Sequence, residues 1–360
     1  MSKTEETKAI LNLTNTALIS IFFILVLGGV IIFALALNYE NLTKISSHKA
    51  AEFPVEMESN KILEQRDYFS RDFDVSKLGN TIQDSMIKYG HELITNTSKL
   101  IGPSNGNSSK QFAGNNLECK NCHLEAGTKP FSAPYVGIYG RFPQYRGREN
   151  KVGSLEERVN GCMERSMNGK KLPENGKEMR AIVAYMNWLS KEIPTGEKIE
   201  GTGFKPIKIP QRKVSLENGK SLYAQKCSSC HNQDGTGTKN PDGNYAFPPI
   251  AGKDSYNQGA GMHRVLTSAQ FIKYNMPLGA TVQNPILTDE EAYDIAGFIN
   301  TLERPGKKNT KKDFPDLKRK PISTPYGPWV DNFPPEQHKF GPYQEIIEWY
   351  KTEFNLEKNK

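Results

Sequence analysis

The stretch CKNCH at residues 119–123 returns as CSSCH at residues 227–231, and the two copies hold four of the five cysteines of the chain. Matching segments flank them: GHELI and GKSLY come before, and IVAYMNWL and IAGFINTL come after. The first copy has the longer middle section. A repeated order of segments predicts two similar domains, each built as helix, CxxCH, loop and helix.

Two cysteines three residues apart and followed at once by histidine are typical of covalent haem attachment. The thiols bond to the haem vinyl groups, and the histidine reaches the iron from one side. Zinc is the alternative, but zinc usually takes four ligands from two close pairs, whereas each pair here lies in its own repeat. We therefore expect two covalently attached haem c groups. The predicted attachment residues are Cys119, Cys122, Cys227 and Cys230, and the predicted iron ligands are His123 and His231.

The order of the segments resembles class I cytochrome c domains, in which the terminal helices cross and a methionine completes the iron coordination. The predicted fold class is therefore mainly α, with two such domains in tandem behind an N-terminal transmembrane helix. In the second domain, FIKYNMPLG supplies Met276 directly before Pro277, as the axial methionine stands in that family. Met262 and His263 lie nearby, but they are more simply loop side chains. A thioether opposite histidine raises the reduction potential, which suits an electron-transfer haem.

The fifth cysteine lies in ERVNGCMERSMNGKKLP, residues 157–173, where the first domain departs from the pattern of the second. Counted back from the closing helices, Met163 corresponds to Met276. Cys162 stands one residue earlier, and Met167 is also within reach. Spacing therefore leaves open whether a methionine is the ligand and Cys162 is a buried small hydrophobe.

Positive charge around Cys162 favours the cysteine as the ligand. Five arginines lie in the surrounding sequence, namely Arg141, Arg146, Arg148, Arg158 and Arg165. Guanidinium groups near a thiol lower its pKa, and the thiolate is the form that binds metal or attacks sulfur. A thiolate ligand lowers the reduction potential, so we expect one haem for chemistry and one for electron transfer.

Composition divides the rest of the chain. Residues 17–37 carry no charge and are long enough to cross a hydrocarbon core of about 30 Å, so we expect a membrane anchor. A signal sequence cleaved near the ALA at residues 34–36 is the alternative. The predicted divisions are a cytoplasmic N-terminus (1–16), the anchor (17–37), a tether (38–75), the first cytochrome c domain (76–195), a linker (196–215), the second cytochrome c domain (216–304) and a Pro/Lys-rich extension (305–360).

The charge of the chain restricts its partners. The net charge is +7, and several lysines gather between residues 307 and 320. We interpret them as a solvated loop, and we exclude nucleic acid as a partner because the chain is expected outside the cytoplasm. A positive field would still attract an anionic substrate or an acidic redox partner. The apolar stripe near the C-terminus is predicted to be a packing face, and it consists of Ile346, Ile347, Tyr350 and Phe354.

Three stretches, NNLECKNCHLEAGTKPF, GRFPQYRGRE and ERVNGCMERSMNGKKLP, together resemble the diheme thiosulfate dehydrogenase / tetrathionate reductase family. The similarity extends from about residue 89 to residue 302, and the YGPWVDNFPPEQHKFGPYQ tail is similar too. The resemblance implies His123 and Cys162 as ligands of the first iron. It implies His231 and Met276 as ligands of the second iron. It also implies substrate contacts by three residues, Arg148, Arg158 and Ser166.

Three further positions bear on this resemblance. Two of the remaining arginines, Arg146 and Arg165, are more simply partners of the haem propionates. Some members of the family carry a lysine ligand directly before the methionine, where this chain has Asn275. Switching between lysine and methionine ligands is therefore not expected here.

The expected function is that of a periplasmic oxidoreductase, tethered to the inner membrane, that interconverts thiosulfate and tetrathionate. Both ions are doubly negative, and the planar fork of arginine suits the oxygens of a sulfonate. A periplasmic or membrane cytochrome c-type protein is the expected electron donor or acceptor. The alternatives are a plain diheme electron carrier, a sulfur-carrier cytochrome that loads thiosulfate onto a partner protein, and a diheme peroxidase.

Overall fold

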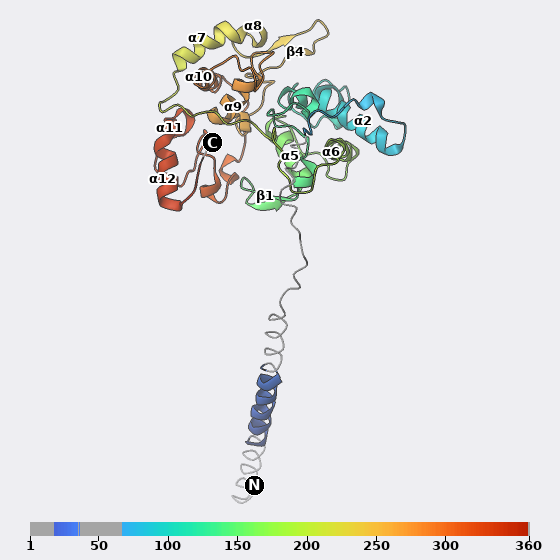
Figure 1. The fold of residues 1–360 in the computed structure, drawn as a ribbon, viewed down its shortest axis with the longest axis vertical. Helices are drawn as coiled ribbons and strands as arrows, with labels where there is room; N and C mark the ends of the chain where they lie inside the picture. The colour runs from blue at the N-terminus through green and yellow to red at the C-terminus, as the bar shows by residue number, and fades with distance from the viewer. Residues whose placement is uncertain (1–17, 35, 37–66, 359–360) are drawn as a thin grey trace, which may run out of the picture. The chain divides into compact units, whose positions relative to one another are not determined.

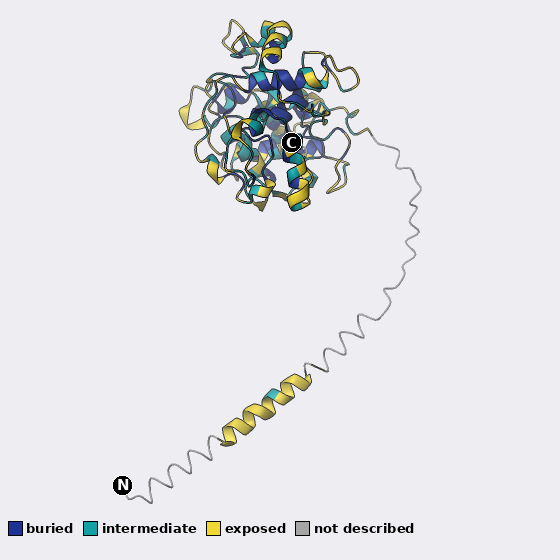
Figure 2. Ribbon diagram, turned by 90° about the vertical axis from the view of Figure 1, so that its left-hand side faces the viewer, coloured by how far each residue is buried: buried dark blue, intermediate teal, exposed yellow. Residues whose placement is uncertain are grey.

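The computed structural model describes residues 18–34, 36 and 67–358 (Figure 1). The chain divides into two compact units, Met1–Arg66 and Asp67–Lys360. In the first unit, residues 18–34 form a helix whose side chains are nearly all exposed (Figure 2). Within the described ranges, no helix is both long enough and apolar enough to span a bilayer.

Most of the predicted N-terminal divisions lie outside the residues that the structure describes. The N-terminus (1–16) and most of the tether (38–75) lie outside the described residues, as do three positions of the predicted anchor, 17, 35 and 37. The predicted anchor (17–37) therefore stays a prediction.

The second unit contains two crossing pairs of helices, as the sequence repeat predicts. In the first pair, α2 (Ile82–Thr95) packs against α6 (Lys177–Leu189). In the second pair, α7 (Leu216–Lys226) packs against α10 (Asp289–Ile299). Local sequence fixes where three of these helices begin, because Thr81, Ser215 and Thr288 cap their first backbone N–H groups.

Glycine permits the close crossing in both pairs. A Cβ on Gly90 would lie 2.1 Å from the backbone oxygen of Ala181, and a Cβ on Gly219 would lie 2.1 Å from that of Asp294. No other residue fits at either position without moving the partner backbone. The repeated glycine of the sequence is thus a repeated packing requirement.

The remaining elements of the second unit are short. In the first domain they are α3 (Thr97–Ile101), α4 (Leu124–Gly127), α5 (Leu155–Arg165) and an antiparallel pair of strands, β1 (Gln144–Arg146) and β2 (Lys151–Gly153). In the second domain they are α8 (Ser228–His231), α9 (Val265–Asn275) and the antiparallel strands β3 (Thr238–Lys239) and β4 (Tyr245–Phe247). The C-terminal extension adds α11 (Pro335–Phe340) and α12 (Gln344–Phe354).

Seven 3-10 turns complete the described elements. They are η1 (Val75–Lys77), η2 (Ser108–Lys110), η3 (Cys119–Asn121), η4 (Tyr139–Arg141), η5 (Gly261–His263), η6 (Thr310–Lys312) and η7 (Leu317–Arg319). The described fold is therefore mainly helical, as the sequence predicts.

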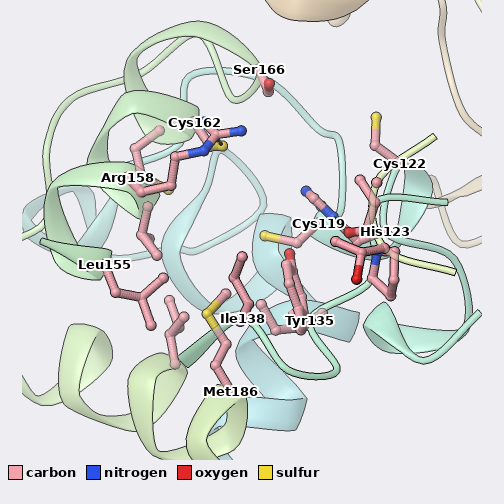
Figure 3. Close-up of a pocket in the computed structure, with 18 of the residues that line it drawn as sticks. Cys119, Cys122, His123, Tyr135, Ile138, Leu155, Arg158, Cys162, Ser166 and Met186 are labelled. Atoms are coloured by element: carbon pink, nitrogen blue, oxygen red, sulfur yellow. Dashed lines mark hydrogen bonds between the residues drawn. The ribbon is translucent and has the colours of Figure 1, made fainter. Parts of the chain in front are cut away.

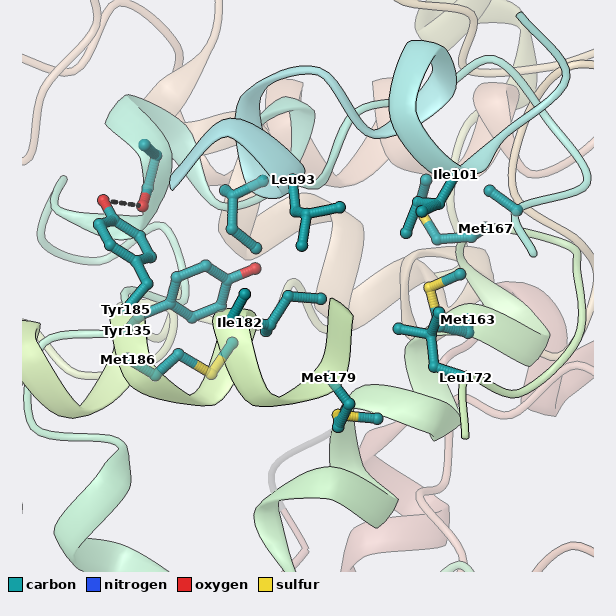
Figure 4. Close-up of a cluster of buried hydrophobic side chains, with 14 of the residues drawn as sticks. Leu93, Ile101, Tyr135, Met163, Met167, Leu172, Met179, Ile182, Tyr185 and Met186 are labelled. Atoms are coloured by element: carbon teal, nitrogen blue, oxygen red, sulfur yellow. Dashed lines mark hydrogen bonds between the residues drawn. The ribbon is translucent and has the colours of Figure 1, made fainter. Parts of the chain in front are cut away.

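Two hydrophobic cores lie in the second unit. The first is built mostly on α2, α5 and α6, and its closely packed side chains include Leu93, Met163 and Leu172 (Figure 4). The second core is built on α9 and α10, and it takes in Ile346 and Tyr350 of α12. These two α12 side chains are 0% and 1% exposed, so the predicted packing face is confirmed. The C-terminal extension is thus part of the second core.

A loop of the second domain packs on the first. Tyr256 and Ala260 belong to the first core although they follow the second CxxCH motif in the sequence. Asn257 is 1% exposed, and its Nδ2 donates to the backbone oxygen of Glu164 at the end of α5 (2.9 Å). Asn115 Nδ2 donates to the backbone oxygen of Ser166, also at 2.9 Å. These buried amides fix the end of α5 against both domains.

Candidate functional site

The first CxxCH motif opens onto a cavity of about 460 Å³. Cys119, Cys122 and His123 line one wall of this cavity (Figure 3). His123 Nδ1 donates to the backbone oxygen of Ala133 at 2.6 Å, and the Tyr135 ring stacks on the imidazole with 4.5 Å between centroids. A hydrogen bond at Nδ1 fixes the ring and leaves Nε2 as the metal-binding nitrogen. The donor set and the cavity therefore fit a covalently attached haem with His123 on its iron.

The second motif repeats this arrangement at the histidine. His231 Nδ1 donates to the backbone oxygen of Pro248 at 2.8 Å, so Nε2 is again the nitrogen left for a metal. Cys227 and Met276 are both partly buried against the second core. Met276 is the C-terminal cap residue of α9. The competitor Met262 packs instead against the first core, and His263 is buried with its Nδ1 on the backbone oxygen of Gln258.

Cys162 lies on α5, on the wall of the first cavity opposite the CxxCH residues (Figure 3). The helix begins at Ser154, whose side chain forms a capping box with Glu157. One turn before Cys162, Arg158 donates from Nη1 to the Cys162 Sγ at 3.4 Å. The sequence prediction that a guanidinium stands beside this thiol is borne out in the geometry.

Three thiols face this cavity, and their pKa values differ sharply. Burial raises the pKa of Cys119 and of Cys122 to about 12. Burial also acts to raise the pKa of Cys162, but the charge of Arg158, a hydrogen bond from His123 and the charge of Arg146 together bring it down to about 6. Cys162 is therefore the thiol with thiolate character at neutral pH.

The rival methionines line the same cavity. Met163 is 2% exposed and Met167 is 4% exposed, and both belong to the first core (Figure 4). Their burial agrees with a packing role, whereas Cys162 is only partly buried and has a cationic neighbour. The choice of ligand between Cys162 and Met163 remains a prediction.

A second cavity, of about 370 Å³, shares Cys162, Arg158 and Ser166 with the first. Arg146, Arg148 and Arg165 also line it, so the structure gathers most of the predicted arginines around one space. These three differ from Arg158 in having carboxylate partners. Arg146 pairs with Glu149 at 3.0 Å.

Arg148 and Arg165 share a single carboxylate from the C-terminal extension. Arg148 Nη1 lies 2.7 Å from Asp313 Oδ2, and Arg165 Nη2 lies 2.7 Å from Asp313 Oδ1. Tyr326 OH donates to Asp313 Oδ2 at 2.8 Å and accepts from Arg148 Nη1 at 3.0 Å. One carboxylate facing two guanidinium groups leaves this cluster with a net positive charge.

Comparison with known proteins identifies the family. The SoxA/TsdA cytochrome c domain matches residues 109–195, and the cytochrome c domain matches residues 216–303. The thiosulfate dehydrogenase of Allochromatium vinosum is 44% identical over 198 residues, which are 54% of this chain and 72% of that protein. The chain belongs to the TsdA family of diheme cytochromes c.

Two further similarities show how far the alignment with TsdA-family proteins extends. The thiosulfate dehydrogenase of Psychrobacter arcticus is 45% identical over 204 residues, 56% of this chain and 61% of that protein. The solved thiosulfate dehydrogenase (TsdBA) of Marichromatium purpuratum, in its as-isolated form, matches with a TM-score of 0.60 at 34% identity. That match covers 65% of this chain and 49% of the solved chain. This TsdA-family chain therefore spans about half to three fifths of the length of these two relatives.

Membership of the TsdA family confirms the predicted pair of cytochrome c domains. Two such domains imply c-type haems, and they are consistent with a periplasmic location. The haem ligands, the substrate contacts and the domain boundaries stay predictions.

The sequence alone does not indicate several residues that line the site of this TsdA-family chain. Asp313 lies in the extension whose lysines predict a solvated loop, and no local pattern links Asp313 to the arginines. Arg264, Thr267 and Gln270 of the second domain line the cavity of the first. Their spacing of three along one helix is the signal that could have indicated a common face.

Proposed function

We propose that this TsdA-family chain is an oxidoreductase that interconverts thiosulfate and tetrathionate. In this reaction two thiosulfate ions form one sulfur–sulfur bond and lose two electrons. The proposal rests on one observation, a thiol beside a guanidinium group that faces the first CxxCH motif across a cavity. Its Sγ, on Cys162, lies 3.4 Å from Arg158 Nη1.

The residues that would hold the two haem groups follow from the site. Cys119 and Cys122 attach the first haem, with His123 and Cys162 as the iron ligands. The second haem has a matching set of residues, namely Cys227, Cys230, His231 and Met276. When bound, the two haems each accept one electron, which together matches the two electrons that the reaction releases.

Cys162 carries the sulfur chemistry in two steps. Its thiolate bonds to the sulfane sulfur of one thiosulfate, and two electrons leave as this sulfur–sulfur bond forms. A second thiosulfate then attacks the sulfane sulfur of the adduct, so that tetrathionate departs and Cys162 is again a thiolate. Neither step transfers a proton. The second step is a thiol–disulfide exchange, in which a leaving thiol of low pKa departs faster.

Arg158, Arg148 and Ser166 are proposed to position the sulfonate groups. At about 4 Å and an effective dielectric constant of about 20, one charge pair is worth about 4 kcal/mol. The value is smaller for Arg158, because its side chain is exposed. Arg148 contributes the surplus positive charge of its cluster with Arg165 and Asp313.

Electron exchange is proposed to take place at the second haem. Its His231 and Met276 ligands favour a higher potential than a histidine–thiolate pair, so the two haems have different tasks. The partner is proposed to be a cytochrome c-type protein in the periplasm or at its membrane. The reaction is reversible, and the reduction potentials of the redox partners set its direction.

The test replaces Cys162 with glycine and, as a matched control, Met163 with leucine. Cys162→Gly should still carry two covalent haems, as measured by mass spectrometry. It should lose tetrathionate formation. It should also lose the narrow low-spin ferric signal that a thiolate ligand gives in electron paramagnetic resonance. Met163→Leu conserves volume and should keep both. The reverse outcome, a signal and an activity that depend on Met163 and not on Cys162, would refute the proposal.

The same assay separates the alternatives. A plain electron carrier would reduce and oxidise normally but would form no tetrathionate with an artificial acceptor. A sulfur-carrier cytochrome would form little tetrathionate alone and would need a partner thiol. Only the proposed enzyme would form tetrathionate as a purified chain and lose this activity when the Cys162 thiol is removed.

A further inference from the structure

Helix α9 has two faces with different surroundings. Val265, Leu266, Ala269 and Ile272 belong to the second hydrophobic core. Arg264, the residue that caps the helix, and Thr267 and Gln270 line the first cavity instead. Residues three apart lie on one side of a helix, so these three form a continuous polar face. The second cytochrome c domain thus supplies a wall of the site that contains Cys162.

Two of the three side chains on this face, Thr267 and Gln270, make no hydrogen bond within the described part of the chain. Thr267 is 6% exposed, and its hydroxyl oxygen has no hydrogen-bond partner in the described part of the chain. Gln270 is 7% exposed, and no hydrogen bond of its amide occurs among the described residues. Buried polar groups are nearly always hydrogen-bonded, so the buried Thr267 hydroxyl indicates that a ligand completes it, and the Gln270 amide one helical turn away is free to bind the same ligand.

Arg264 adds a positive charge that no described carboxylate neutralises. Its only hydrogen bond among those residues runs from Nε to the backbone oxygen of Gly261 at 3.3 Å, which leaves both terminal nitrogens unengaged. Burial, together with the like charges of Arg148 and Arg158, lowers the pKa of Arg264 to about 9. Three guanidinium groups therefore converge on this space, and their repulsion is relieved by an anion.

Two other features support an anion here. The N-terminus of α9, an eleven-residue helix, carries a partial positive charge next to Arg264. Among the arginines of the described chain, Arg158 and Arg264 are the two that line both cavities, and neither has a carboxylate partner there. Arg158 lies at the thiol, so Arg264 is available for a second anionic group.

We infer that Arg264, Thr267 and Gln270 form an oxyanion subsite in the cavity of the first haem. The ligand is a sulfonate or a carboxylate, since both offer oxygens to a guanidinium fork, a hydroxyl and an amide. A sulfonate ligand would belong to the second thiosulfate or to the far end of tetrathionate, and this assignment rests on the proposed function. The carboxylate source is a propionate of the first haem.

The experiment uses the haem-loaded full-length protein with Arg264→Gln. Its matched control is Arg180→Gln, which removes one charge from an exposed position on α6. Two quantities are measured: the thiosulfate KM against kcat with an artificial acceptor, and the reduction potential of the first haem without substrate. If Arg264→Gln fails to load haem, Thr267→Val keeps the shape of the side chain and removes only the hydroxyl.

A tenfold or larger rise in KM with kcat within twofold identifies the substrate sulfonate as the ligand. An unchanged KM with a lower potential of the first haem identifies the propionate. Thr267→Val should change the same quantities less: KM should rise a few-fold if the ligand is the substrate, or the potential of the first haem should fall by a smaller amount if the ligand is the propionate. If KM and potential both stay at the values of Arg180→Gln, the subsite is refuted. If the wild-type protein did not oxidise thiosulfate, the proposed function would fail while the potential would still test the subsite.

Discussion

Replacing Asp313 with asparagine should destabilise the folded protein by about 3–5 kcal/mol. Asp313 holds two guanidinium groups at 2.7 Å, and the side chains of Arg148, Arg165 and Asp313 are only 17%, 13% and 9% exposed. Asparagine keeps the size of the side chain but not its charge. Two cations would then stay partly buried without the anion that compensates them.

The magnitude follows from opposing effects. At 2.7 Å and an effective dielectric constant of about 20, each ion pair is worth about 6 kcal/mol of attraction. Removing three charged groups from water offsets most of this gain, so the net value of the cluster is far below the sum. Breaking such a buried pair by removing one partner typically costs about 3–5 kcal/mol, because the other charge is left behind.

The assay is guanidinium chloride unfolding of the haem-loaded protein, followed by helical circular dichroism at neutral pH. Asp316→Asn is the matched control, since Asp316 belongs to the same extension and contacts Arg319 at 3.7 Å with both side chains exposed. An exposed pair of this kind is worth at most about 1 kcal/mol. Equal losses for the two variants would refute the view that Asp313 anchors the extension to the site.

The same variant has a pH signature. Burial acts to raise the pKa of Asp313, but Arg148 and then Arg165 outweigh it and hold the pKa below its ordinary value of 3.8. A depressed folded-state pKa gives stability that is present above pH 3.8 and is lost as pH falls through the lowered value. The difference between wild type and Asp313→Asn should therefore stay constant from neutral pH to about pH 5 and shrink below pH 4.

Two further predictions address the fold and the second haem. Gly90→Ala and Gly219→Ala should each lower the thermal midpoint by several degrees, because the added Cβ would meet a carbonyl oxygen at 2.1 Å; Gly106→Ala, with no atom within 4 Å of its Cβ, should leave it nearly unchanged. Met276→Leu should lower the potential of the second haem in a redox titration while thiosulfate turnover with a fast artificial acceptor persists; loss of that turnover would contradict the division of labour.

Much of the fold could be predicted from the sequence, because its determinants are local or repeated. The CxxCH motifs, the closing helices and the paired Gly90 and Gly219 all occur twice in the same order, and the structure places them in two equivalent helix crossings. Cys162 could also be placed near a guanidinium, since Arg158 precedes it by one helical turn.

The missing parts of the site depend on contacts between distant segments. Asp313 lies 165 residues from Arg148 in the sequence, so no periodic pattern joins them. The polar face of α9 has the same residue spacing as a solvated helix face, and the sequence does not reveal which surface lies opposite it. Both features require the packed arrangement of the two domains and the extension.

Helix α9 (Val265–Asn275) has Arg264 as its N-terminal cap residue at the first cavity and Met276 as its C-terminal cap residue, and its eleven residues span about 16 Å at 1.5 Å per residue. This one helix therefore supplies a wall of the first cavity and also the residue that is proposed to bind the second haem iron. The consequence is that the two halves are not interchangeable modules. A chimera in which a foreign cytochrome c domain follows residue 215 would keep Cys162 but would lose the wall of the first cavity that α9 supplies.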